Sequence, residues 1–260
     1  MSLLDPIART QLGEKLQSEL RGKKSNEPTS LLEASWRDFI YSEVWSRPGL
    51  DRRSRFLISI AGAACEGASS EIMENYVRGA LTTGELTQAE LREAALHLAV
   101  YAGWSRGTFI DKTITKVAHE LNMPLAEIPP IRGEAWDPKL RLTEGAANFT
   151  AVMTFPSPPP VVPYFEAGIL NFVFGEMWMR PGLDQRSRRW VTMVGVSESA
   201  STTPIRTHTY AAMASGNATL PEMHEFVLQY AIHGGWPKAS VMQAVVFEMG
   251  KRVTEGLPYE

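Results

Sequence analysis

The chain has 260 residues, of which 44% are hydrophobic and 21% are charged, and its formal net charge is −3. This composition is typical of a folded globular protein and excludes a disordered or fibrous chain. A net charge this small gives no general attraction to nucleic acids or membrane surfaces, so we expect neither as a partner.

The first residues and the cysteine content indicate the compartment. The opening MSLLDPIARTQLGEKL places charges where a signal peptide has its apolar core. No apolar run approaches the ~20 residues needed to cross a bilayer. Cys65 is the only cysteine, so an intramolecular disulfide and a CxxC motif are both excluded. We therefore expect a cytoplasmic protein.

The sequence contains an internal repeat. VWSRPGLDRRSR, which begins at Val44, returns as MWMRPGLDQRSR at Met177, 133 positions later. Further along, the residues of the first copy return at a spacing of 132: Gly84, Thr87, Glu90, Glu93, Gly103 and Trp104 match Gly216, Thr219, Glu222, Glu225, Gly235 and Trp236. A spacing held over this length predicts a duplicated domain, with residues 1–132 as the first copy and 133–260 as the second.

The predicted elements of the first copy are helices. Asp51 follows the Arg-Pro-Gly-Leu turn and is placed to cap the next helix. In SEIMENYVRGALTTG, apolar residues at Met73, Val77 and Ala80 share one face with Tyr76, as in an amphipathic helix. A capping box at Thr87-x-x-Glu90 begins another helix, which we expect to end near 102–103.

The second copy repeats these signals. Asp184 is the expected cap after its turn, Thr203 is expected to cap a helix with Pro204 in its first position, and a second capping box stands at Thr219-x-x-Glu222. The helix that begins there is expected to end near 234–235. FPSPPPVVPYF indicates an extended connector inside this copy. No alternating pattern indicates a strand, so we predict an all-α fold of two similar helical domains packed as an intrachain pseudo-dimer.

These motifs resemble the carboxymuconolactone decarboxylase family, which includes the AhpD-type alkylhydroperoxidases. The family pattern is a Trp-Ser-Arg-Pro-Gly-Leu-Asp turn, an ELRxH helix, a T-x-x-E-capped helix and a YxGxP exit. The resemblance covers roughly residues 39–121 and 172–253. Its peroxidase branch implies a CxxC before the histidine, but this chain has Ser201 and Pro204 there, and Ser69 and Ile72 in the first copy. The sequence around Cys65, AGAAC, favours a buried filler.

The resemblance therefore implies the decarboxylase branch: a cofactor-free lyase or isomerase that acts on a small carboxylated lactone or a related carbonyl acid. Two alternatives stay open. One is a thiol-dependent peroxidase-like protein, and the other is a non-catalytic binding or assembly protein of the same fold. Decarboxylation requires a cation for the substrate carboxylate, a hydrogen-bond donor for the enolate and a source of protons.

Two histidines are candidates for the proton chemistry. His208 matches the histidine of the family's ELRxH helix, and a histidine exchanges protons near neutral pH. Tyr76 stands at the same position of the first copy. It is a poor base at neutral pH but could donate a hydrogen bond, so we expect it to bind substrate and the two copies to be chemically unequal. His233 occupies the family's YxGxP tyrosine position. The alternative for each is a structural role in the core.

The repeated turn supplies the candidates for substrate binding, because arginine pairs with carboxylates through two hydrogen bonds. They are Arg47, Arg55, Arg180 and Arg188, with Trp178 beside them and Glu176 as a candidate acid or base. A structural interpretation is open for each, in which the arginine ties down the turn, the tryptophan fills the core and the glutamate pairs with an arginine.

No set of histidine, aspartate and glutamate has metal-ligand spacing, so we predict no metal and no cofactor. Each copy alone would leave apolar faces uncovered. The resemblance implies assembly into trimers or hexamers, and we expect a homotrimer of the duplicated chain, with a dimer as the second choice.

Overall fold

The computed structural model describes residues 4–132, 135 and 137–260. Throughout these residues the regular structure is helical and no strand occurs, which confirms the all-α prediction. The helices are α1 (Pro6–Leu20), α2 (Leu31–Ser35), the π-helix η1 (Trp36–Val44), α3 (Arg52–Cys65), α4 (Ser70–Thr82), α5 (Gln88–Ala102), α6 (Trp104–Glu120), α7 (Pro138–Met153), the π-helix η2 (Tyr164–Phe174), the 3₁₀ turn η3 (Met177–Met179), α8 (Gln185–Glu198), α9 (Thr202–Ala214) and α10 (Leu220–Thr254).

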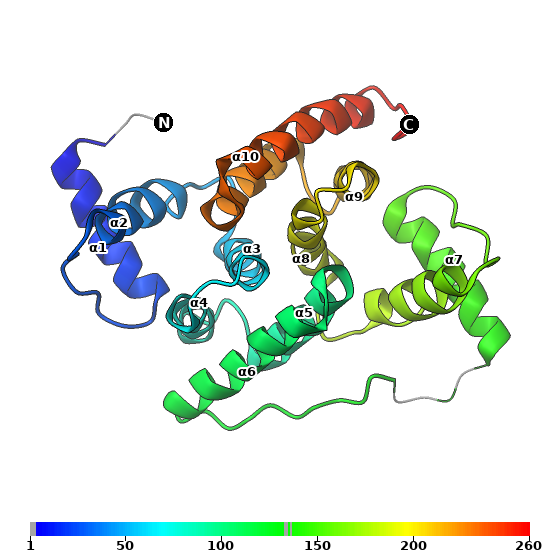
Figure 1. Cartoon of the computed structure of the whole chain (residues 1–260), viewed down its shortest axis with the longest axis horizontal. Helices are drawn as coiled ribbons and strands as arrows, with labels where there is room; N and C mark the ends of the chain where they lie inside the picture. Colours follow the sequence, from blue (N-terminus) through cyan, green and yellow to red (C-terminus); the bar gives the residue numbers. More distant parts are fainter. Residues whose placement is uncertain (1–3, 133–134, 136) are drawn as a thin grey trace.

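The helices form an elongated molecule with α3 and α8 at its centre (Figure 1). These two helices pack against each other, α10 packs on α3, and α5 packs on α8. At one end α1 packs on η1, and at the other end α7 packs on η2. Each of the two predicted domains therefore contributes one central helix and covers the central helix of the other.

One hydrophobic core extends across both predicted domains. Its buried residues include Phe56 and Ile60 from α3 and Trp190 and Val194 from α8. This packing is what an intrachain pseudo-dimer requires, although the division at residues 132 and 133 stays a prediction. Residues 133, 134 and 136, close to that division, lie outside the described residues.

Helix starts follow the local sequence signals closely. Asp51 Oδ1 accepts the Ser54 backbone N–H at 2.8 Å, and Asp184 does the same for Ser187 at 2.8 Å. Both capping boxes form, at Thr87 and at Thr219. Each of these contacts satisfies backbone donors that the first turn of a helix would otherwise leave free.

One predicted helix boundary differs from the structure. Thr203 is not a cap, because α9 begins at Thr202 after Ser201 and Pro204 lies within its first turn. The helix that begins at Leu220 is interrupted near 234–235, as predicted: Gly235 has a non-helical φ of 78°, and a second helical segment follows it to Thr254 within α10. A positive φ suits glycine because it has no Cβ.

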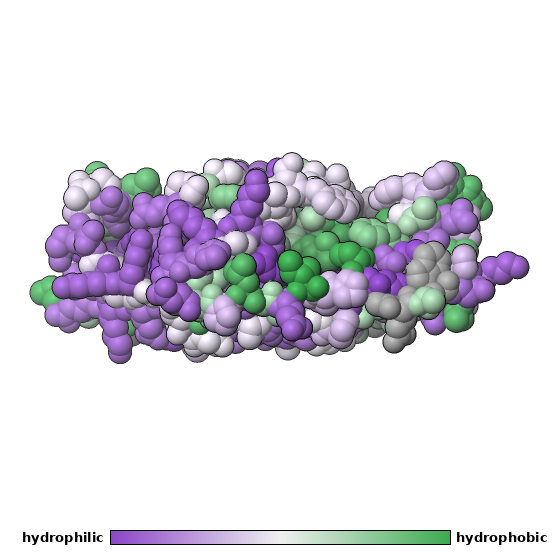
Figure 2. All heavy atoms as spheres, turned by 90° about the horizontal axis from the view of Figure 1, so that it is seen from below, coloured by the Kyte–Doolittle hydropathy of each residue, from purple (hydrophilic) through white to green (hydrophobic). Residues whose placement is uncertain are grey.

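Part of the surface is apolar. Residues 123–132 run as a non-helical segment along the lower edge of the molecule in Figure 1 and leave Leu125, Ile128 and Ile131 exposed. In the view from below, hydrophobic residues gather near the middle of this face (Figure 2). None of the described helices combines the length and apolar composition of a membrane-crossing segment.

Candidate active site

Two tyrosine–histidine pairs lie where the predicted domains meet. The Tyr76 hydroxyl and His233 Nε2 are 3.0 Å apart. Tyr101 and His208 meet edge to face, with their ring centres 5.4 Å apart. Tyr76 corresponds to His208 in the repeat, and Tyr101 corresponds to His233. Each pair therefore has one tyrosine and one histidine, and each takes its tyrosine from the first predicted domain and its histidine from the second.

Tyr76 lines an open cavity of about 470 Å³, and His233 is not among the lining residues. The end of α1, the loop of residues 23–29, the π-helix η1 and α4 surround this space. We call it the first cavity, and its polar or aromatic lining includes Gln17, Arg21, Ser25, Trp36, Tyr41, Asn75 and Tyr76. A cavity of this size suits a small organic molecule.

The π-helix η1 places two aromatic walls of the first cavity together. Trp36 and Tyr41 are five residues apart, and a π-helix turns once in about that interval. Their ring centres are therefore only 6.2 Å apart. Behind them, the ring of Trp45 stacks on that of Tyr76 with centres 6.1 Å apart. The aromatic packing fixes the position of the Tyr76 ring at the cavity wall.

Burial keeps the Tyr76–His233 pair uncharged near pH 7. Desolvation lowers the pKa of His233 to about 4 and raises the pKa of Tyr76 well above its usual value. Both groups are consequently neutral hydrogen-bonding partners. Such a pair can stabilise a developing oxyanion by a hydrogen bond without carrying a charge of its own.

The second pair, around His208, has a different environment. Arg189 lies 4.9 Å from the ring centre of Trp178, and its Nη1 is 3.4 Å from His208 Nδ1. Burial is the main reason why the pKa of His208 falls to about 3 and that of Arg189 to about 10. Within the described part of the chain, Arg189 forms no ion pair with a carboxylate, and Phe56 stands at the corresponding position of the first predicted domain.

Aromatic side chains fill the space beside this second pair. Trp178 donates its indole N–H to the Tyr101 hydroxyl at 2.7 Å and stacks on Phe174. Phe149 in turn packs against Phe174 with ring centres 4.6 Å apart. His208 is 8% exposed and is absent from the lining of the first cavity.

The four predicted substrate-binding arginines all pair with glutamates across the two predicted domains. Arg47 and Arg55 bind Glu225, with shortest distances of 2.6 and 3.0 Å. Reciprocally, Arg180 and Arg188 bind Glu93, at 2.5 and 3.3 Å. Although burial raises the pKa of each glutamate, the arginine hydrogen bonds outweigh it and hold the pKa below its usual value.

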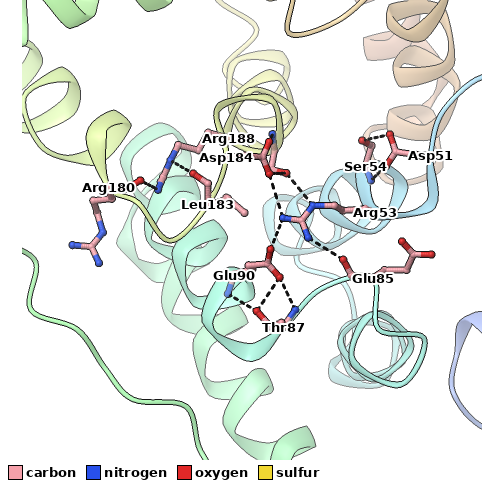
Figure 3. A network of polar contacts seen from close by, with 11 residues as sticks. Asp51, Arg53, Ser54, Glu85, Thr87, Glu90, Arg180, Leu183, Asp184 and Arg188 are labelled. Atoms are coloured by element: carbon pink, nitrogen blue, oxygen red, sulfur yellow. Dashed lines mark hydrogen bonds and ion pairs between the residues drawn. The ribbon is translucent and has the colours of Figure 1, made fainter.

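These ion pairs hold the four arginines between the two predicted domains, and none of the four lines the first cavity. Arg188 also donates to the carbonyl oxygens of Leu183 and Arg180, as Figure 3 shows. Arg180 alone of the four lines a second cavity, of about 480 Å³, together with Glu93 and Glu176. His208, Arg180 and Arg188 thus do not converge on one described cavity, and the contacts favour the structural interpretation of the arginines.

Glu176 is also paired. It lies 2.6 Å from Arg141 on α7, and Glu43 at the corresponding position lies 2.6 Å from Arg9 on α1. Arg9 and Glu43 join α1 to the π-helix η1. Arg141 and Glu176 join α7 to the turn that follows the π-helix η2. This arrangement favours a structural role for Glu176 over a role as acid or base.

Sequence reasoning overlooked several residues of these sites. Arg21, Asn75 and Trp36 line the first cavity, and Arg189 lies against His208. A signal for Arg189 was present, since it is a charged residue where the other copy has Phe56. Glu93 and Glu225 were visible as a repeated pair, but nothing in the sequence indicated that each one binds arginines of the other copy.

No cluster of three or more histidine, cysteine, aspartate or glutamate side chains suited to a metal ion occurs among the described residues. Cys65 is buried, and desolvation raises the pKa of its thiol to about 12. A thiol in this environment is a poor nucleophile because only the thiolate attacks.

Comparison with known proteins gives a partial assignment. Residues 31–109 match the carboxymuconolactone decarboxylase family. Over 87 residues, 34% of this chain, it is 34% identical to 4-carboxymuconolactone decarboxylase of Acinetobacter baylyi (strain ATCC 33305 / BD413 / ADP1). That match spans 64% of the relative's length, which is less than two thirds. No solved structure matches the chain significantly.

The carboxymuconolactone decarboxylase match coincides with the walls of the first cavity. It contains the π-helix η1 and the whole of α4, and with them Trp36, Tyr41, Asn75 and Tyr76. Arg21 and Ser25 precede it in the sequence, and His233 lies beyond it. The family match and the first cavity therefore both lie in the first predicted domain.

Proposed function

We propose that the protein is a cofactor-independent lyase of the decarboxylase type, or a related isomerase, that acts on a small carboxylated lactone or related carbonyl acid. The observation that carries the proposal is Tyr76, which lines the first cavity and whose hydroxyl lies 3.0 Å from His233 Nε2. The distant similarity to a 4-carboxymuconolactone decarboxylase supports the choice of substrate class.

The reaction needs few parts. The bond between the substrate carbon and its carboxylate breaks, CO₂ leaves, and the bonding electrons pass into an enolate. With His233 Nε2–H donating to the tyrosine oxygen, the Tyr76 hydroxyl donates a hydrogen bond to the enolate oxygen. One proton is consumed for each CO₂ released. Water in the cavity delivers this proton to the substrate carbon beside Tyr76 and His233.

This proposal assigns the chemistry to His233 and Tyr76 rather than to His208. Aromatic side chains pack around both pairs, but Tyr76 lines the first cavity, whereas Tyr101 and His208 line neither of the two cavities. A single working site per chain follows. The polar lining of the first cavity also argues against a purely structural protein, whose pocket would need no buried hydrogen-bonding groups.

The thiol-dependent alternative has little support. Cys65 is the only cysteine, it is buried, and its high pKa leaves almost no thiolate near neutral pH. We further propose that the chain is a tandem pair of domains, 1–132 and 133–260, forming a pseudo-dimer, and that three chains assemble. The reciprocal arginine–glutamate pairs support the first part of this proposal.

The direct test is CO₂ release from a panel of small lactone and oxo acids that includes 4-carboxymuconolactone. We expect turnover of at least one acid by the unmodified protein. Tyr76→Phe should lower kcat by ~10²–10³-fold, the usual effect of removing one oxyanion donor.

Tyr101→Phe is the matched control because it removes the hydroxyl of the other tyrosine–histidine pair. We expect a change in kcat of less than ~3-fold from it, since it lies outside the proposed site. Equal losses in the two variants, or no turnover of any acid by the unmodified protein, would refute the proposal.

A further inference from the structure

Three buried polar atoms without hydrogen-bond partners belong to residues that line the first cavity. They are Arg21 Nε, Ser25 Oγ and Asn75 Oδ1. Asn75 is 6% exposed. Buried polar atoms in native proteins are nearly always paired, and an unpaired one costs ~1–3 kcal/mol. These atoms are closed to solvent as the side chains stand, and a small turn of the side chains toward the cavity would let a ligand supply the missing partners.

From this set we infer that Arg21, Ser25 and Asn75 form the recognition end of the first cavity. They select a small acid whose carboxylate binds Arg21 and Ser25 and whose hydroxyl group donates a hydrogen bond to Asn75 Oδ1. The inference builds on the proposed function, because it names the substrate groups that the same site distinguishes.

The lining of the first cavity carries three cations, Arg21, Lys23 and Lys24, and three carboxylates, Glu27, Glu33 and Glu71. Glu71 holds Arg21 Nη2 at 3.2 Å, which anchors the guanidinium while Nε keeps its donor. Glu33, another carboxylate of the lining, accepts from the Thr29 backbone at 2.6 Å and from the Thr29 hydroxyl at 2.9 Å. Arginine N–H donors pair with carboxylates in strong, charge-assisted hydrogen bonds.

The corresponding positions of the second predicted domain lack this set. Met153 stands where the first domain has Arg21, and it is buried in the aromatic cluster around Trp178. Thr207 stands in place of Asn75, and its hydroxyl donates to the Thr203 carbonyl oxygen at 2.9 Å. The shared fold therefore does not require Arg21 or Asn75, which is expected of residues that serve a ligand.

The experiment exchanges these residues for their counterparts, in Arg21→Met and Asn75→Thr. Calorimetric titration measures binding, and Tyr76→Phe is present in every protein compared, in order to slow turnover. The ligands are 4-carboxymuconolactone, the same lactone after its carboxylates are esterified, and a hydroxy acid of similar size. We expect Arg21→Met to weaken binding of the acids ~10–100-fold, as loss of a charge-assisted hydrogen bond does. It should leave the ester almost unaffected, whereas Asn75→Thr should weaken the hydroxy acid more than the lactone.

Two further variants control the comparison. Lys139→Met removes an exposed cation on α7, outside the first cavity, and should bind the acid as the unmodified protein does. Arg21→Lys keeps the charge and should restore part of the affinity, even if Arg21→Met folds poorly. Unchanged affinity in Arg21→Met, or no binding of the acid at millimolar concentration, would overturn the inference.

Failure of this inference is distinguishable from failure of the proposed function. Turnover with an unchanged KM in Arg21→Met would overturn the recognition site and leave the lyase proposal intact. Binding of the acid that depends on Arg21, with no CO₂ release, would overturn the lyase proposal and leave the recognition site intact.

Discussion

Burial sets the protonation of the two tyrosine–histidine pairs, whereas arginine contacts set that of Glu93 and Glu225. Tyr76 and His233 are both neutral because desolvation disfavours their charged forms. His208 is neutral for the same reason, and Arg189 beside it lowers its pKa further. Two sites built from the same residue types thus differ in neighbouring charge, and only the first contributes a residue, Tyr76, to the cavity lined by Arg21 and Asn75.

Cys65 gives a prediction at the residue scale. With its thiol pKa raised to about 12, alkylation by iodoacetamide at pH 7.5 should be at least ~10³-fold slower than that of a free thiol. Mass spectrometry over time measures the rate. Cys65→Ala should retain turnover, and thiol-dependent peroxide consumption that disappears in this variant would favour the redox alternative instead.

The candidate residues could be found from the sequence only in part. His233 and Tyr76 were visible because they occupy repeated positions where a histidine and a tyrosine exchange places. Arg21 and Asn75 were not, since one is a single charge near a helix end and the other lies on a helix face. Their significance depends on unpaired atoms at a cavity wall, which is a property of tertiary packing.

At the scale of elements, the repeated turns are joined by reciprocal ion pairs. Glu225 on α10 binds Arg47 and Arg55, and Glu93 on α5 binds Arg180 and Arg188. A second pair of reciprocal ion pairs joins the starts of α3 and α8. Arg53 at the start of α3 lies 3.3 Å from Asp184, the cap of α8 (Figure 3). Arg186 reaches Asp51 at 3.1 Å in the same way.

Removal of one glutamate tests this link. Glu225→Ala leaves the buried Arg55 guanidinium without its carboxylate and should lower the free energy of unfolding by about 3–5 kcal/mol. Urea denaturation measures the change. Glu255→Ala, which removes an exposed partner of Lys251, is the control and should cost less than ~0.5 kcal/mol. Equal losses would contradict the structural role.

The glycines of the two turns explain part of the repeated motif. A Cβ on Gly49 would lie 2.8 Å from Glu225 Cγ, and one on Gly182 would lie 2.7 Å from Glu93 Cγ. We expect Gly182→Ala to destabilise the protein by ~1–3 kcal/mol, because the glutamate must move within its ion pairs. In a Glu93→Ala background the same substitution should cost much less, and equal costs in both backgrounds would refute this explanation.

For the whole molecule, the sequence predicted the all-α fold and most helix starts, because caps and apolar faces are local signals. It missed the π-helices. It also could not indicate which helices pair across the predicted domains. That pairing depends on contacts between residues more than 100 positions apart, such as Arg47 with Glu225.

Buried histidines give the molecule a pH dependence of stability. Burial depresses the pKa values of His97, His208 and His233 in the folded state. Below pH 6.5 the unfolded chain therefore binds more protons, and stability is lost as the pH falls. Each histidine should cost ~1.4 kcal/mol by pH 5.5 relative to pH 7.5.

Urea unfolding at the two pH values checks this dependence. His97→Gln, which introduces the residue found at position 229 of the second domain, should remove about a third of the difference. His119→Gln, at an exposed position, should leave it unchanged. A stability that rises as the pH falls from 7.5 to 5.5 would contradict the buried, neutral state of these histidines.

The measurement that tests the central claim most directly is the kcat/KM of two matched variants, His233→Gln and His208→Gln, on the acid that the protein decarboxylates. With the Tyr76–His233 pair as the working site, kcat/KM should fall ~10²-fold or more in His233→Gln and less than ~3-fold in His208→Gln. A large loss in His208→Gln with near-normal activity in His233→Gln would place the reaction at the other pair and contradict the account.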